Sequence, residues 1–166
     1  DKDGDHGTGV FVPRRDTSSM LNVMAGGRLF PGTHHFARFE VREHNNCLHV
    51  AMNSNDGLAH ILVDGNVTSD LPHDSIFHST AAVSEFFEAG SLGYSPSSSK
   101  ERFDGLELRT LNWHVEPLAV DCVETSFFED ESIFPAGSVT FDCALLMRGI
   151  SHEWHGRDSI CCNGVS

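Results

Sequence analysis

Alternation of apolar and polar residues over three successive segments is the feature that most constrains the fold of this chain. From His34 onward, an extended chain places Ala37, Phe39 and Val41 on one side and Phe36, Arg38, Glu40 and Arg42 on the other. A period of two residues is typical of a strand with one buried face. Further runs at 48–52 and 60–67 follow polar turns, so the sequence predicts an antiparallel meander.

The remaining segments predict more strands and two short helices. One helix is expected after Asp16 or Thr17, and the other after Ser79 or Thr80, because these side chains suit the first turn of a helix and glycines follow each segment. Strands are expected at 10–12, 106–115, 118–128 and 138–147. We therefore predict an α+β fold in which a mostly antiparallel β-sheet curls into a barrel-like core, because so many strand edges must be closed or covered. One β-rich domain is assigned to 1–150 and a polar C-terminal tail to 151–166.

Length and charge limit the classes of partner. A chain of 166 residues is expected to form one domain with its own core. The formal net charge of −13 disfavours nucleic acid and anionic membranes as partners, and no apolar run has the length of a membrane span. The five cysteines are scattered without a CxxC pair, and Cys47, Cys122 and Cys143 lie in apolar or alternating runs where burial is expected. These features predict a cytoplasmic protein with neither a structural zinc site nor a cofactor.

The segment 25–40 concentrates the candidate binding residues. Arg28 lies among glycines that would let the backbone approach a ligand closely, so it is a candidate ligand-binding residue. His34, Arg38 and Glu40 would place a base, a cation and a carboxylate along one strand face, where they could hold a small carboxylate and move a proton. His35 is a second candidate proton carrier on the opposite face of the strand, so the two histidines cannot both bind one metal ion without distortion. The alternative interpretation is a solvated outer face.

Other chemistry has weaker signals. His152 and His155 are three residues apart and would share a face only on a helix, and the spacing is one residue short of the zinc-protease pattern. A metal-dependent hydrolase is therefore a distant hypothesis, and no metal site is predicted. The chain has no GxSxG elbow, and its two lysines, Lys2 and Lys100, lie in loop-like contexts that do not favour a Schiff-base amine.

The segment 25–40 resembles the acetoacetate decarboxylase-like superfamily. Gly27-Arg28-Leu29-Phe30-Pro31-Gly32-Thr33 stands where the decarboxylases have a Gly-Arg-Glu segment followed by Tyr-Pro-Lys-Lys. The segments VPRRDTSSMLN, FFEAGSLGYSP, FDGLELRTLNWHVEPLAV and FPAGSVTFDCALLMRGISHEWHGR are similar to an uncharacterised bacterial branch of that superfamily, a domain of unknown function. The resemblance implies a cone-like barrel with a pocket. It also implies an N-terminally truncated chain, because members of the branch usually carry additional sequence before this point.

The resemblance also implies that decarboxylation through a lysine Schiff base is not expected of this chain. The Schiff-base lysine of the decarboxylases and its neighbouring lysine fall at Gly32 and Thr33, and neither residue can supply the amine that forms the imine. Two hypotheses follow: a domain that binds a small organic acid or acts on it without lysine chemistry, and a non-catalytic structural or interaction protein. Either would be compatible with a homo-oligomer.

Overall fold

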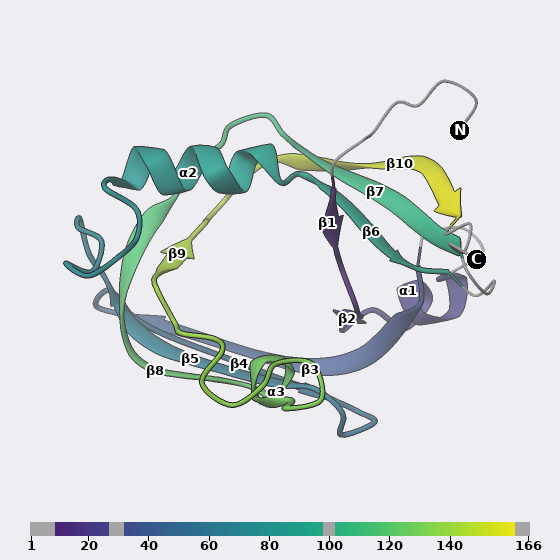
Figure 1. The fold of residues 1–166 in the computed structure, drawn as a ribbon, viewed down its shortest axis with the longest axis horizontal. Helices are drawn as coiled ribbons and strands as arrows, with labels where there is room; N and C mark the ends of the chain where they lie inside the picture. Colours follow the sequence, from purple (N-terminus) through teal and green to yellow (C-terminus); the bar gives the residue numbers. More distant parts are fainter. Residues whose placement is uncertain (1–8, 27–31, 98–101, 162–166) are drawn as a thin grey trace.

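The computed structural model describes residues 9–26, 32–97 and 102–161. This part of the chain is mostly strand, arranged in two sheets that curl into a half-barrel (Figure 1). The smaller sheet has the order β1-β6-β7-β10, formed by Val10–Phe11, Leu92–Pro96, Arg102–Thr110 and His152–Cys161. The larger sheet has the order β2-β3-β4-β5-β8-β9, formed by Arg15–Thr17, His34–His44, Cys47–Ser54, His60–Val67, Glu116–Thr125 and Ala144–Leu146.

The expected meander is present as β3, β4 and β5, with β8 added on its far side. All three pairings are antiparallel. Asn45 and Asn46 link β3 to β4 and have positive φ values of 49° and 66°. Two such residues form a tight hairpin turn that matches the twist of the strands, and asparagine tolerates this backbone better than most residues.

The two faces of the larger sheet differ as the alternation predicts. Its apolar face carries the buried side chains Ala37, Leu48, Met52 and Leu118. Its polar face carries exposed Arg38 and Glu40 on β3. On β3 itself only Ala37 of the apolar face is buried, whereas Phe39 and Val41 are exposed, so the expected buried face is present at one end of the strand only.

Three helices occur in the described residues: α1 (Met20–Ala25), α2 (Thr80–Ala89) and α3 (Ser126–Glu129). Ser79 caps α2 by accepting a hydrogen bond from the Ala82 amide, and Gly90 follows the last turn, both as predicted. The first helix is instead capped by Ser19. The predicted caps Asp16 and Thr17 belong to β2, because this segment pairs with β3 as a parallel strand.

Several other sequence predictions are wrong. The run 118–128 does not stay extended, since its last residues turn into α3, and in 138–147 only β9 is a strand. Residues 152–161 of the segment assigned to a polar tail form β10 and pair with β7 along most of its length. The strand is highly exposed, so its composition resembles that of a tail. Cys47 is exposed rather than buried, because it starts β4 on the polar face of the sheet.

In the described residues, no helix combines the length and the apolar character that crossing a membrane requires.

Candidate functional site

A cavity of about 480 Å³ lies where the two sheets approach each other beside β2 and α1. Figure 1 shows α1 at this end of the half-barrel, where it packs against β3. The volume is within the range of pockets that bind small molecules, roughly 300–1,000 Å³. Its wall combines polar groups from β2, α1 and β3 with apolar groups from β7 and β10, among them Arg15, Thr17, Asn22, His34, Leu106 and Trp154.

Arg15 is the central charged group of the cavity. Its Nε donates a hydrogen bond to Ser95 Oγ at 2.6 Å, which joins β2 to the smaller sheet. Its Nη2 is buried and has no hydrogen-bond partner among the described residues. Burial lowers the pKa of Arg15, and the nearby Asp104 partly offsets this effect. A buried guanidinium nitrogen without an acceptor costs free energy, and an anionic group that accepted a hydrogen bond from it would offset this cost.

The nearest carboxylate groups are engaged elsewhere. Asp16 accepts hydrogen bonds from Nε and Nη2 of Arg14. Asp104 accepts from the Gly32 amide at 3.2 Å and from the Ser159 hydroxyl at 2.8 Å. These hydrogen bonds help to hold the pKa of Asp104 below its usual value, although burial opposes them. Other donors therefore orient both carboxylates, which leaves Arg15 Nη2 without an acceptor among the described residues.

His34 is the second polar group with an unsatisfied atom. Its Nδ1 is buried and lacks a partner within the described part of the chain. Burial, together with the positive charge of Arg15, lowers the pKa of His34, so the imidazole is neutral at pH 7. A neutral imidazole beside a guanidinium can exchange a proton with a bound acid. Gly26 lets His34 Nδ1 lie close to the backbone, because a Cβ atom at residue 26 would be only 2.7 Å from this nitrogen.

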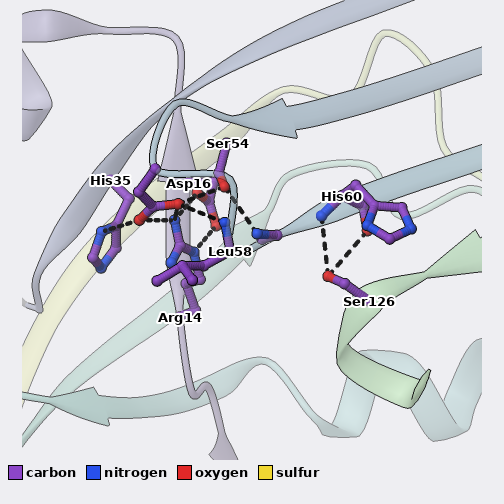
Figure 2. A network of polar contacts seen from close by, with 9 residues as sticks. Arg14, Asp16, His35, Ser54, Leu58, His60 and Ser126 are labelled. Atoms are coloured by element: carbon purple, nitrogen blue, oxygen red, sulfur yellow. Dashed lines mark hydrogen bonds and ion pairs between the residues drawn. The ribbon is translucent and has the colours of Figure 1, made fainter. Parts of the chain in front are cut away.

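A network of ion pairs fixes β2 beside the meander (Figure 2). Arg14 bridges Asp16 and Asp56, with Nε–Oδ2 and Nη2–Oδ2 distances of 2.8 Å each. Asp56 also accepts hydrogen bonds from the Ser54 hydroxyl and the Leu58 amide. Ser54, Leu58 and Arg14 hold the pKa of Asp56 far below its usual value. The network secures the strand that carries Arg15, and it thereby positions the guanidinium in the cavity.

The predicted site residues are only partly brought together. His34 lines the cavity. His35 lies on the other side of β3, as predicted, with its Nδ1 3.4 Å from Asp56 Oδ2. Arg38 and Glu40 are exposed and do not line the cavity, because β3 carries them roughly 13 and 20 Å beyond His34. Arg28 lies outside the described residues.

Arg15 and Trp154 line the cavity and Ser95 binds Arg15, but none of the three is among the site residues predicted from the sequence. Arg15 precedes the expected helix, although two adjacent arginines are notable in a chain with only 11 lysines and arginines. Trp154 belongs to the segment predicted to be a tail.

The structure places His152 and His155 on a strand, β10, and not on the helix that a shared metal site would need. His152 and His155 lie on a strand three positions apart, so their side chains point to opposite faces. Among the described residues, no group of three or more His, Cys, Asp or Glu side chains is arranged to hold a metal ion.

Comparison with family models, curated proteins and solved structures finds no match for the chain.

Proposed function

We propose that this protein binds a small organic acid in the cavity between its sheets, with Arg15 as the anion-binding group and His34 as a proton carrier. The observation that carries the proposal is the buried Nη2 of Arg15, which has no acceptor among the described residues although Arg15 lines a cavity of ligand size. A carboxylate would supply that acceptor in a charge-assisted hydrogen bond. Binding would also favour protonation of the adjacent His34, which offsets part of its lowered pKa.

We further propose that the site belongs to the decarboxylase-like scaffold but works without an amine nucleophile. Gly32, at the position where the resemblance expects the Schiff-base lysine, is buried and has a φ of +78°. A Cβ atom at Gly32 would lie 3.0 Å from Arg15 Nε and 3.1 Å from Ser95 Oγ. The Arg15–Ser95 contact therefore occupies the space that a side chain at this position would need. This arrangement favours recognition of an acid through a guanidinium.

Calorimetric titration with acetate, butyrate and inorganic phosphate tests the proposal. Arg15→Gln removes the charge but keeps a polar side chain. We expect its affinity for a carboxylate to fall by about 1.5–3 kcal/mol, or roughly 10- to 150-fold. Arg42→Gln is the matched control, because Arg42 is exposed on the polar face and pairs with Glu40. Equal affinities in the two variants, both folded by thermal denaturation, would refute the assignment of Arg15.

A second candidate function, a non-catalytic interaction protein, is favoured by a different observation. The apolar face of the larger sheet leaves Phe39 and Val41 of β3 exposed, together with Ile61 of β5 and Val123 of β8. Strand register places these side chains in adjacent rows of one face. A contiguous apolar patch is typical of interaction surfaces. Light scattering after size-exclusion chromatography tests self-association, and a monomer at high protein concentration would contradict a homo-oligomer built on this face.

A further inference from the structure

We propose that the acid bound in this cavity has a flat, aromatic body attached to its carboxylate through a short linker. This inference rests on the proposed function and adds the class of ligand. The body would lie against Leu106 and Trp154, while the carboxylate faces Arg15.

The cavity wall formed by the smaller sheet changes from polar to apolar along its strands. Ser95 and Asp104 are cross-strand partners at the polar end, where Arg15 binds Ser95. The next row on the same face contains Leu106, and the row after it pairs Leu108 with Trp154. Successive residues on one face of a strand are roughly 6.5–7 Å apart, so the polar row and the Trp154 row are separated by about 13 Å. A ligand with charge at one end and an apolar group at the other matches this gradient.

Glycines flank Leu106 on both neighbouring strands, and one of them leaves the wall low. Gly93 on β6 and Gly156 on β10 are its cross-strand partners and share its face. Val12 covers Gly93, since a Cβ atom there would lie 2.9 Å from Val12 Cγ2. Gly156 is exposed, so the wall stays open on the side of Trp154. Leu106 therefore presents its surface beside an uncovered strip of backbone, which a planar group can approach.

Trp154 has the exposure expected of a binding residue. The residue is 56% exposed although it lines the cavity. A tryptophan offers a large planar surface, and aromatic pairs gain more than their buried area alone provides. The other tryptophan, Trp113, is engaged, because its Nε1 donates a hydrogen bond to Ser84 Oγ at 2.7 Å. The two tryptophans thus differ in a way that a titration can resolve.

The experiment titrates the complete chain with butyrate, 3-phenylpropanoate and 3-cyclohexylpropanoate, and follows both indole N–H signals by NMR. The Trp154→Leu variant assigns the signals, and Trp113 serves as the internal control. We expect 3-phenylpropanoate to bind about tenfold more tightly than butyrate and several-fold more tightly than the cyclohexyl acid, and to shift only the Trp154 signal. In Trp154→Leu, the affinity for 3-phenylpropanoate should fall about tenfold, and the preference for this acid over butyrate should be lost.

The outcomes separate this inference from the function on which it rests. Equal binding of butyrate and 3-phenylpropanoate, with loss of both in Arg15→Gln, would overturn the aromatic body and keep the acid site. Equal binding of the phenyl and cyclohexyl acids would overturn the requirement for a flat group. Absence of binding by all three acids would overturn both proposals. A shift of the Trp113 signal alone would place the ligand elsewhere and overturn this inference.

Discussion

Gly32→Ala tests whether Arg15 is held in the position that the site requires. Gly32 has a φ of +78°, in the left-handed region that an alanine occupies at a cost of about 1–2 kcal/mol. Its added methyl group would also meet Arg15 Nε at 3.0 Å and Ser95 Oγ at 3.1 Å. Those two atoms are joined by a 2.6 Å hydrogen bond, so neither can move without weakening it. Overpacking of this kind costs about 1–3 kcal/mol.

Gly57→Ala is the matched control for the backbone contribution. Gly57 has nearly the same φ, +72°, but no atom lies within 4 Å of the position of an added Cβ. Alanine also reduces the conformational entropy of the unfolded chain, which returns about 0.4–1 kcal/mol in both variants. We therefore expect Gly57→Ala to lower the free energy of unfolding by about 0.5–1.5 kcal/mol and Gly32→Ala by about 2–4 kcal/mol.

Urea-induced unfolding, followed by circular dichroism, measures both values, provided that the urea dependence of the free energy is the same in both variants. Gly32→Ala should in addition weaken binding of a carboxylate, because the guanidinium is displaced, whereas Gly57→Ala should not. Equal destabilisation by the two substitutions would show that Arg15 and Ser95 give way freely. The reasoning that places a rigid guanidinium against Gly32 would then be refuted.

Three further predictions concern titrating groups. Burial and the charge of Arg15 lower the pKa of His34, so the neutral imidazole contributes fully to stability above about pH 6.5, and this contribution is lost as the pH falls through the folded-state pKa. The urea midpoint should therefore decrease less between pH 7.5 and 5 in His34→Gln than in the wild type. Identical profiles would contradict a lowered pKa of His34. Burial raises the pKa of Cys143 to about 11, so iodoacetamide at pH 8 should alkylate exposed Cys47 before Cys143. Peptide mass spectrometry measures the order, and faster alkylation of Cys143 would contradict the burial of its thiol. Hydrogen bonds from Ser54, Leu58 and Arg14 lower the pKa of Asp56, so Asp56→Asn should lower the urea midpoint at pH 7. The difference in urea midpoint between the variant and the wild type should shrink below about pH 4, where the wild-type carboxylate begins to lose this advantage. A constant difference down to pH 2 would exclude the ionised carboxylate as the cause.

The meander and the second helix could be predicted because their causes are local. Alternation from Ala37 to Val41 determines which face of β3 is apolar, and Asn45-Asn46 favours a tight reversal before β4. Ser79 and Gly90 limit α2 through caps that depend on adjacent residues. In each case the residues that determine the structure lie within one element or one turn of it.

β2 and β10 could not be predicted in the same way. Asp16 has the chemistry of a helix cap, but its carboxylate is taken by Arg14, and its backbone pairs with His35 of β3. The segment 152–161 is polar and highly exposed, so no apolar alternation marks it as a strand. Its partner β7 provides the backbone hydrogen bonds that keep it extended. Pairing with a distant strand overrides weak local preference at both places.

The candidate site likewise contains residues that the sequence predicts and residues that only the fold brings together. His34 is predictable from its position on a strand, whereas the exposed positions of Arg38 and Glu40 show that a shared strand face does not place side chains in one cavity. Arg15 was overlooked because nothing in its immediate sequence indicates burial. Its position in the site depends on Ser95, which is 80 residues away in the chain.

The sequence by itself determined the strand periodicity, the turn between β3 and β4, the limits of α2 and the absence of a lysine at Gly32 and Thr33. Tertiary structure decided which polar groups meet: parallel pairing of β2 with β3 places Arg15 beside His34, and the approach of the smaller sheet adds Leu106 and Trp154. The physical reason is the distance along the chain over which each effect acts. Backbone preference and alternation act within a few residues, whereas burial of a charge depends on surfaces that only the folded chain brings into contact.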